Sequence, residues 1–523
     1  MNRRSFIFRS AAAATLPVLL NGFPVRAWAR NKRLAALTGL DTETDRVLVL
    51  VQLNGGNDGL NTVLPLDQYS SLARARANIL IPDTQALLLE GNAGLHPAMS
   101  GMHSLFQEKL LAVVQSAGYP NPNFSHFRAT DIWTSASDAD EVVTSGWLGR
   151  YLDTEYPGFP EGYPSAEFPD PPAITIGSVL SATCQGPVMN MGLAITDPDN
   201  VTELLNGGSD EIPNSRYGYE LNFLRQTVRQ TNQYLDVIQD ASGMGQNLSP
   251  LYPEAGANRL ADQLKIVARL IAGGLKTRVY VVGIGGFDTH ANQVDSSDNT
   301  QGNHAALLRN VSDAIAAFQD DLGKLGLADR VVGMTFSEFG RRIKSNASLG
   351  TDHGSAAPLF VFGSQVNSKV FGTTPVIPSS VTDQDNLPMQ HDFRSVYASL
   401  LQDWFSVPAE TIQAVLFDEF QYIPLIRKPG STPEIGDVPV LMPLQPNPFF
   451  STAKLVFQTP GGRVQIRLFD GSGRTVALVT DQEFDRGEYE LPFDGSALAE
   501  GAYYLRLQQG SHQAMQMVWK RAQ

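Results

Sequence analysis

The sequence predicts an α/β protein with a mostly parallel sheet sandwiched by helices, followed by a small C-terminal all-β sandwich. Two observations predict the first part: continuous apolar, β-branched runs, and amphipathic helical segments between them. A third predicts the second part, because the pattern after residue 446 changes to short alternating strands at about ten-residue spacing. With 523 residues, the chain is long enough for a large domain and an appendage.

Five buried strands are predicted in the first part, at 46–53, 110–114, 278–284, 330–336 and 359–362. Apolar residues recur at helical spacing before the third strand, and a second helical stretch, 305–325, precedes the fourth. Alternating strands and helices indicate a parallel sheet covered on both faces. Ligands of such sheets bind beyond the carboxyl ends of the strands, so candidate site residues are sought there.

Residues 1–29 are predicted to be an export signal peptide. Arg3 and Arg4 precede a short apolar run, and Ala27-Trp28-Ala29 fits a small-x-small cleavage site. The segment resembles a twin-arginine signal; the alternative is an ordinary secretory signal with a chance arginine pair. Either signal predicts that the mature chain is exported to the periplasm. The apolar run is too short to span a bilayer, so no transmembrane segment is expected in the mature chain.

Composition limits the partners. The chain has 39 Lys and Arg against 53 Asp and Glu, a net charge of −14, so nucleic acid and anionic membrane surfaces are not expected partners. A single cysteine, Cys184, rules out an intramolecular disulfide framework and a cysteine-rich metal site.

Metal-ligating residue types follow the third and fourth predicted strands. Asp288 and His290 are two residues apart, so in extended backbone they project to one side and can bind one metal together; a solvated loop is the alternative. Asp352 and His353 are adjacent and point in different directions, so they can serve two neighbouring metals. The four residues form the core of the predicted metal site.

The turn 54–59 after the first strand supplies Asp58 as a further candidate metal ligand and Asn57 as a candidate substrate-binding residue. A simple strand-ending turn is the alternative there. His391 can complete a metal site, although Asp392 beside it is more readily explained as a helix N-cap.

Two further residues have two interpretations each. Ser125 follows the second strand at a predicted helix start, where it can be a catalytic nucleophile or a helix cap. Arg341 can bind substrate, or it can form an internal ion pair with Glu338 that braces the loop.

Mixed carboxylate and imidazole ligands favour zinc or manganese over magnesium or calcium. Two such divalent ions can stabilise the attacking and leaving oxygens of a displacement at phosphorus or sulfur.

Several of these segments resemble the family called domain of unknown function 1501, which is grouped with the alkaline phosphatase/sulfatase superfamily. The resemblance is carried by VLVLVQLNGGNDGLNTVLP (47–65), NFSHFRATDIW (123–133), GWLGRYL (146–152), GGFDTHANQ (285–293), TFSEFGRRIKSNASLGTDHGSAAPLFVFG (335–363) and DFRSVYASLLQDWF (392–405). It implies an alkaline phosphatase-like sheet and paired metals.

The same resemblance implies roles for single residues. Asp58 is implied to be the first-strand ligand and Ser125 to hold the nucleophile position. Asp288, His290, Asp352 and His353 are implied to be the remaining ligands. The third histidine usual in phosphatases is matched only loosely, by His391. No Cys-x-Pro-x-Arg motif occurs, which disfavours a formylglycine-type sulfatase.

The C-terminal segment resembles the type A sorting domain of the type IX secretion system, through Pro446 to Phe449, 470–475 and 498–505. This resemblance implies passage over the outer membrane to the cell surface or medium. The predicted domains are the signal (1–29), an α/β domain (30–427), a linker (428–446) and the sorting domain (447–523). The export machinery and the outer-membrane secretion system are the expected partners.

The sequence therefore predicts an exported metal-dependent hydrolase-like protein that acts on phosphate or sulfate esters of a small molecule or glycan. The alternative is a non-catalytic cell-surface binding protein on a degenerate phosphatase or sulfatase scaffold.

Overall fold

The computed structural model describes residues 18–20, 23–25, 45–199, 215–427, 438–441, 444, 447, 449–510 and 512–521. The arginine pair of the predicted export signal and most of the predicted linker lie outside these residues. Met1–Arg46 form a unit separate from Val47–Gln523, and within it β1 (Val18–Leu20) pairs antiparallel with β2 (Phe23–Val25).

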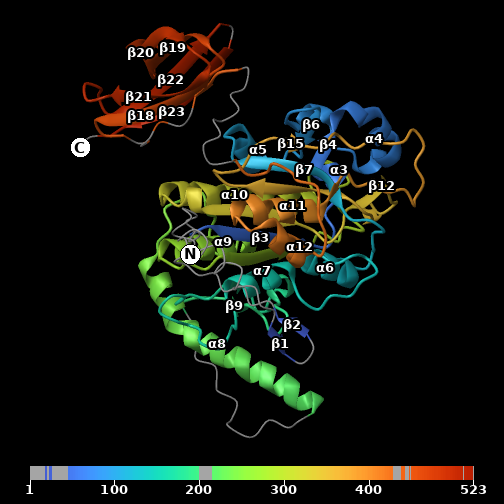
Figure 1. Cartoon of the computed structure of the whole chain (residues 1–523). Coiled ribbons are helices and arrows are strands. Elements are labelled where there is room, and N and C mark those ends of the chain that lie inside the picture. Colours follow the sequence, from blue (N-terminus) through green and yellow to red (C-terminus); the bar gives the residue numbers. More distant parts are fainter. Residues whose placement is uncertain are drawn as a thin grey trace, which may run out of the picture. The chain divides into compact units, whose positions relative to one another are not determined.

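A nine-stranded sheet forms the centre of the α/β part (Figure 1). Its order is β15–β7–β14–β11–β3–β10–β8–β9, with β16 also paired to β7. The strands are β3 (Val47–Asn54), β7 (Leu111–Gly118), β8 (Ala173–Ile176), β9 (Gly192–Ile195), β10 (Val279–Gly285), β11 (Val331–Phe336), β14 (Ala357–Phe362), β15 (Val370–Phe371) and β16 (His391–Asp392).

The sheet is mostly parallel, as predicted. β3 pairs parallel with β10 and β11, and β8 continues this direction between β10 and β9. Among the described strands of this nine-stranded sheet, only β14 runs antiparallel to both of its neighbours, β11 and β7. All five predicted strands are present. The sequence analysis missed the four-residue strands β8 and β9, which are too short to give a clear pattern.

Helices cover both faces of this sheet. As a result, Val47 to Val51 of the central strand β3 are buried on both of its sides. One group contains α5 (Ser100–Gln107), α8 (Arg216–Met244), α9 (Arg259–Ala272) and α10 (Asn303–Lys324), and α9 packs on β10 and on α10. The other contains α6 (His126–Ser135), α7 (Trp147–Glu155), α11 (Phe393–Ser399), the π-helical turn η6 (Leu400–Trp404) and α12 (Ala409–Leu416).

Stacked aromatic rings join the second group of helices. Trp147 of α7 stacks on Tyr397 of α11 with ring centroids 4.1 Å apart, and Trp133 of α6 stacks on Phe393 at 4.2 Å. Trp404 donates from its indole nitrogen to the carbonyl of Val47, 3.1 Å away, which ties this group to the central strand. Buried aromatic pairs of this kind stabilise a domain core beyond their buried area. They fix α6, whose first turn enters the site described below.

Shorter elements complete the α/β part. β4 (Val63–Pro65), β5 (Leu87–Leu88) and β6 (Ala93–Leu95) form a small sheet, and β12 (Arg341–Ser345) pairs antiparallel with β13 (Thr351–His353). The remaining helical turns are α3 (Gly59–Thr62), η1 (Leu66–Gln68), α4 (Tyr69–Arg76), η2 (Ala77–Ile79), η3 (Asp83–Gln85), η4 (Ala182–Cys184) and η5 (Ala328–Arg330).

The C-terminal part is an all-β sandwich with its own apolar core, as predicted. One sheet has the order β17–β18–β21 and the other β20–β19–β22–β23. Alternate residues such as Leu455, Phe457, Ile466 and Leu505 are buried between them. The strands are β17 (Val440–Leu441), β18 (Thr452–Thr459), β19 (Gly462–Asp470), β20 (Thr475–Phe484), β21 (Gly487–Asp494), β22 (Gly501–Gln509) and β23 (His512–Lys520).

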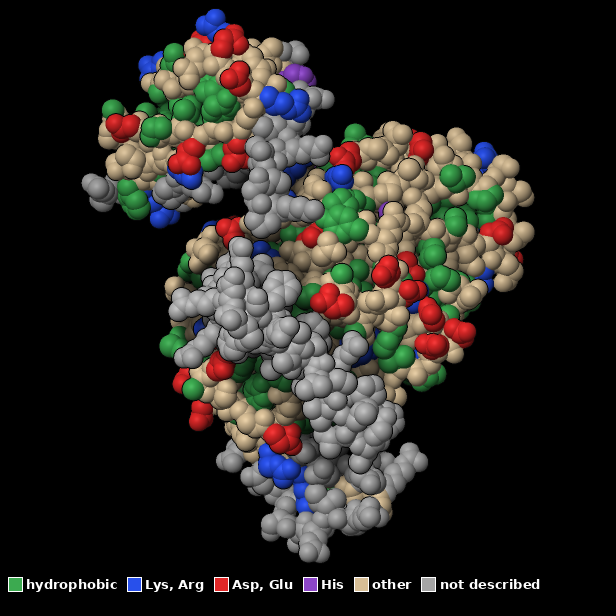
Figure 2. Space-filling model, viewed as in Figure 1, with side chains coloured by type: hydrophobic (Ala, Val, Ile, Leu, Met, Phe, Trp, Pro, Cys, Tyr) green, Lys and Arg blue, Asp and Glu red, His purple; other side chains and the backbone are tan. Residues whose placement is uncertain are grey.

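The surface agrees with the composition. Figure 2 shows acidic side chains spread over the viewed face of the α/β part, in keeping with the net charge of −14. Within the part of the chain that the structure describes, no helix combines the length and the apolar character needed to cross a membrane.

Two helical glycines give a matched test of the packing. A Cβ at Gly149 of α7 would lie 2.1 Å from the backbone oxygen of Gln185, whereas a Cβ at Gly323 of α10 would meet nothing within 4 Å. We expect Gly149→Ala to destabilise the protein by about 1–3 kcal/mol or more through overpacking. Gly323→Ala should instead stabilise it by up to about 1 kcal/mol, through higher helix propensity. Chemical denaturation of both variants measures the difference, and equal midpoints would contradict this packing.

Candidate metal centre

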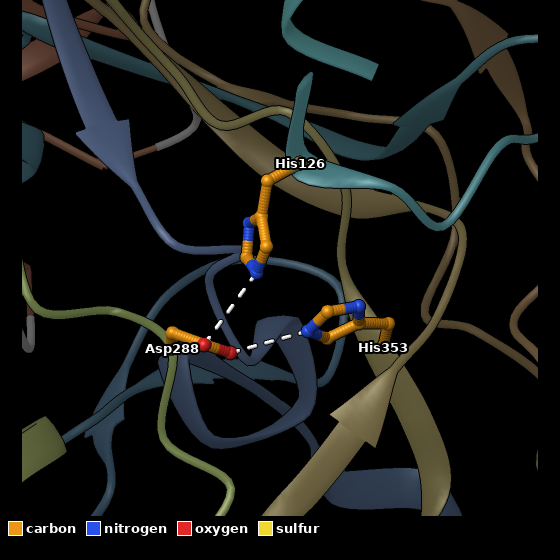
Figure 3. Close-up of side chains that lie close together, drawn as sticks. All are labelled: His126, Asp288 and His353. Atoms are coloured by element: carbon orange, nitrogen blue, oxygen red, sulfur yellow. Dashed lines mark hydrogen bonds and ion pairs between the residues drawn. The ribbon is translucent and has the colours of Figure 1, made fainter. Parts of the chain in front are cut away.

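The candidate site lies where the carboxyl ends of neighbouring parallel strands meet. β10 is followed by Asp288 and His290, and β11 is followed by Glu338. The short β12–β13 hairpin then brings Asp352 and His353 to the same edge, and α6 begins after β7 with His126 (Figure 3). Segments far apart in the sequence therefore supply one cluster, as the strand-end rule predicts.

A glycine pair after β3 allows these loops to approach each other. Gly55 and Gly56 have φ angles of +125° and +79°, in the region that glycine alone adopts readily. A Cβ at Gly55 would lie 2.2 Å from the backbone nitrogen of Asp288, and one at Gly56 would lie 2.2 Å from the ring of Phe339. The pair thus makes room for the backbone of Asp288 and for the Phe339 ring.

The guanidinium of Arg341 joins the loops at the same point. It is fully buried, and its Nε donates to the carbonyl of Gly56 at 2.7 Å while Nη1 donates to that of Thr351 at 2.8 Å. Its Nη2 donates to Asp288 Oδ1 at 2.7 Å and to the carbonyls of Phe287 and Gly55. The guanidinium therefore fixes the position of the Asp288 carboxylate.

Three imidazole rings around Asp288 are each held through Nδ1. His126 Nδ1 lies 2.8 Å from Glu338 Oε1, His290 Nδ1 lies 3.0 Å from Asp352 Oδ1, and His353 Nδ1 lies 2.8 Å from the carbonyl oxygen of Phe124. A carbonyl or an ionised carboxylate can only accept, so each Nδ1 carries the hydrogen. Each Nε2 is then left with a free lone pair, the arrangement found for metal-binding histidines.

The three Nε2 atoms converge on the Asp288 carboxylate (Figure 3 shows two of them). His290 and His353 Nε2 are both 3.2 Å from Asp288 Oδ1, and His126 Nε2 is 3.5 Å from Oδ2. His290 and His353 Nε2 lie 2.9 Å apart, close for two lone pairs unless a proton or cation lies between them. Ligand atoms on a tetrahedral zinc ion lie roughly 3.3 Å apart. The spacing fits a metal.

Three of these side chains, His126, Asp288 and His353, have ligand atoms that all lie within 4.8 Å of one another. His290 adds a third nitrogen, the fourth ligand atom, beside Asp288 and His353. These side chains are partly open to solvent, with 34% of His126 and 47% of Asp288 exposed, so a cation and a second ligand can reach them. The set of donors therefore fits a divalent metal ion with an open position.

Electrostatics favour the metal-binding protonation states. Burial acts to raise the pKa of Asp288, but the hydrogen bond and the positive charge of Arg341 outweigh it and lower that pKa to about 2. Burial also acts to raise the pKa of Asp352. The hydrogen bonds from His290 and Asn346 outweigh it, so that this pKa is lowered. Burial lowers the pKa of His353. Near neutral pH the carboxylates are ionised and His353 is neutral, as metal ligation requires.

Asp58, a predicted ligand, is engaged elsewhere. It is completely buried, pairs with Arg76 at 2.7 Å, and accepts from Gln293 Nε2 at 2.6 Å. Its Oδ1 also caps α3 through Leu60 N at 3.3 Å. Burial acts to raise the pKa of Asp58, but the charge of Arg76 and these hydrogen bonds lower it. Asp58 therefore stabilises the loops through buried contacts, and it is not among the metal ligands that we propose.

The two predicted substrate-binding residues are both buried. Asn57 is 1% exposed, and its Oδ1 accepts from Thr62 Oγ1 and faces His304 Nε2 at 2.9 Å. Arg341 is also 1% exposed, and its donors are directed to protein acceptors. A substrate cannot meet either side chain in this arrangement. The bracing alternative fits Arg341, with Asp288 in place of the expected Glu338 as its carboxylate partner.

Ser125 and His391 have different surroundings. Ser125 is exposed at the N-cap position of α6 and makes no capping hydrogen bond, so the capping alternative is not realised and its Oγ is free. His391 lies in β16, paired with Ala117 of β7, outside the cluster of His126, Asp288 and His353. Asp392 caps α11 by accepting from Arg394 N at 2.9 Å, as its structural interpretation predicted.

The sequence analysis missed His126. It identified the segment around Ser125 as the start of a helix after a strand, but it assigned the chemistry to the serine. The available signal was a histidine in the first turn of a helix at the carboxyl edge of the sheet. Its partner Glu338, 212 residues away, could not be found from spacing.

The comparisons with known families agree with the resemblances seen in the sequence. Residues 223–416 match the family described as "Protein of unknown function (DUF1501)". Residues 444–520 match the family described as "Secretion system C-terminal sorting domain". Both resemblances are confirmed, and the first region contains Asp288, His290 and His353. A comparison with curated proteins finds no match.

Solved structures with detectable similarity are distant in sequence. A protein in the alkaline phosphatase superfamily from Vibrio parahaemolyticus is 12% identical, with a TM-score of 0.30 over 85% of this chain and 83% of that one. A sulfatase from Pseudoalteromonas sp. is 11% identical, with a TM-score of 0.31 over 88% and 85%. An alkaline phosphatase from the Antarctic bacterium TAB5 is 9% identical, with a TM-score of 0.27 over 61% and 91%. The strand order and register, rather than these similarities, establish the fold.

The buried pair beneath the site can be tested by stability measurements. We expect Arg76→Met to destabilise the protein by about 3–5 kcal/mol, because it leaves the Asp58 carboxylate buried without its cation. Since the pKa of Asp58 is lowered in the folded state, the pair contributes its stability above about pH 4, and the contribution is lost on further acidification. Urea denaturation at pH 7 and at lower pH measures both effects. An Arg76→Met/Asp58→Asn variant should recover part of the loss; no recovery would contradict this account.

Proposed function

We propose that this protein is a secreted, metal-dependent hydrolase of phosphate or sulfate esters. The observation that supports the proposal most is the convergence of His126, His290 and His353 Nε2 on one ionised carboxylate, Asp288. Nitrogen and oxygen donors of this kind favour zinc or manganese. The proposal is for one cation, because Asp58 and His391, which a second site would need, lie outside this cluster.

The metal, when bound, would act as a Lewis acid that polarises an ester oxygen. The chain's own residues prepare the site for it. Glu338, Asp352 and the carbonyl of Phe124 fix the three rings through Nδ1, and Arg341 fixes Asp288. Ser125 is the candidate nucleophile, because its exposed Oγ is free of a capping bond and directly precedes His126.

The sorting tail supports an extracellular role. Residues 444–520 match a secretion sorting domain, which indicates a secreted or cell-surface protein. We propose that the type IX system carries it over the outer membrane after export to the periplasm. An enzyme delivered there meets esters outside the cell, so small-molecule or glycan esters are the proposed substrates.

The metal centre is tested by substituting its ligands. We expect the purified protein to bind close to one equivalent of zinc or manganese and to hydrolyse p-nitrophenyl phosphate or p-nitrophenyl sulfate. His126→Ala and His353→Ala should each lower metal affinity at least tenfold and reduce turnover by 100-fold or more, because each removes a ligand nitrogen. Elemental analysis and metal titration measure binding, and a chromogenic assay measures turnover.

His103→Ala is the matched control, since His103 is half-buried on α5, outside the proposed ligand set, and contacts the carbonyl of Leu88. It should change neither quantity. Stoichiometric metal binding without turnover on any ester would favour the non-catalytic binding protein instead. Full hydrolysis by metal-free protein would overturn the proposed mechanism.

The sorting tail is tested by truncation after Arg427. In a host with the type IX system, we expect the full chain to be found at the cell surface or in the medium and the truncated chain to remain in the periplasm. Immunoblots of the cell fractions measure this. Because the sandwich has its own core, the truncated chain should still fold and keep the helical circular dichroism signal of the α/β part. Equal release of both chains would contradict a sorting role.

A further inference from the structure

We infer that a cavity beside the metal centre binds the uncharged, hydroxyl-rich part of the ester, namely a sugar unit. This inference rests on the proposed function for the ester itself and on the cavity for the sugar. The cavity has a volume of about 670 Å³, within the usual range for ligand sites. It lies at the carboxyl ends of β3, β8 and β10, with α6 and α9 contributing to its walls.

The cavity adjoins the metal centre along two elements. Gly285 of its wall is three residues before Asp288, and Asn54 of its wall accepts from Phe287 N through its carbonyl, at 3.1 Å. On α6, Thr130 and Thr134 follow His126 at spacings of four and eight residues, so all three lie on one side of the helix. The cavity is thus lined by the same two segments that carry Asp288 and His126.

Hydrogen-bonding groups line this cavity without being used by the fold. Gln52 and Asn54 are two residues apart on β3 and project to one side of the sheet. Within the described part of the chain, neither side chain makes a hydrogen bond. Gln263 differs, since its amide already exchanges two hydrogen bonds with the backbone of Gly283. The free amides, together with the Thr130 hydroxyl, can recognise hydroxyl groups as both donors and acceptors.

The other lining residues narrow the ligand class. Arg259 and Asp262 are the charged residues among those that line the cavity in the described structure, and their formal charges cancel. The cavity therefore does not concentrate anions. The described residues that line it include no aromatic ring, so a nucleobase would lack a stacking partner among them. Ile176 and Val179 offer apolar surface for the C–H face of a ring. An uncharged sugar fits these properties best.

Binding of simple glycosides tests the cavity separately from catalysis. We would use methyl α-D-glucopyranoside and methyl β-D-galactopyranoside as probes, and adenosine as the aromatic comparison, in saturation-transfer NMR on metal-stripped full-length protein. We expect at least one glycoside to bind at millimolar concentration and adenosine not to bind. Gln52→Leu/Asn54→Leu should weaken glycoside binding about tenfold or more, because it removes two hydrogen-bonding amides.

Thr130→Val gives a second, milder change on another wall and should weaken the same binding. Gln107→Leu, an identical chemical change at an exposed position of α5, should leave it unaltered. Since the probes contain no ester and the protein no metal, failure of the proposed hydrolase would not alter these results. Absence of glycoside binding in the unsubstituted protein, or binding unaffected by both cavity variants, would overturn the inference while leaving ester hydrolysis to stand or fall on its own assay.

Discussion

The buried guanidinium of Arg341 is the interaction on which the candidate site depends. A charge removed from water must be matched by hydrogen bonds and a counter-ion, or it destabilises the fold strongly. Here the match comes from carbonyls after β3 and β10, from Thr351 in β13, and from the carboxylate of Asp288. Satisfying one cation therefore requires three loops to come together. The same contacts keep Asp288 ionised and point its oxygens toward the imidazoles.

A second buried network lies beneath the first and links it to the rest of the core. Gln293 donates to Asp58 at 2.6 Å, and its Oε1 accepts from Thr289 Oγ1 at 3.0 Å and from Thr351 Oγ1 at 2.8 Å. Thr289 lies between Asp288 and His290, and Thr351 precedes Asp352. One amide thus fixes the spacing of the two loops that supply most of the candidate ligands. Such outer contacts orient metal ligands and are needed for a tight site.

The positions of candidate ligands directly after predicted strands carried more information about the site than the residue types alone. Asp288, His290 and His353 were proposed as ligands because they follow predicted strands, and the carboxyl ends of parallel strands meet at one edge of a sheet. Burial could not be predicted in this way, because it depends on partners distant in sequence. Arg341 is buried by loops that begin at Gly55 and Phe287. Asp352 shows the same dependence on a distant partner, since its Oδ1 lies 3.0 Å from Nδ1 of His290, 62 residues earlier.

Helix α6 connects the two halves of the proposed substrate site and therefore sets a distance. Ser125 and His126 occupy its start at the metal centre, whereas Thr130 faces the cavity one turn later. Four residues of α-helix advance by roughly 6 Å, about the width of one sugar ring. An ester group carried directly on a ring can then lie at the metal while the ring lies in the cavity. A long flexible spacer between ester and ring would place one of them outside its subsite and would lose the binding that the cavity supplies. Because one helix carries both groups, the proposed site would select for the position of the ester through the fold itself, without a separate recognition loop.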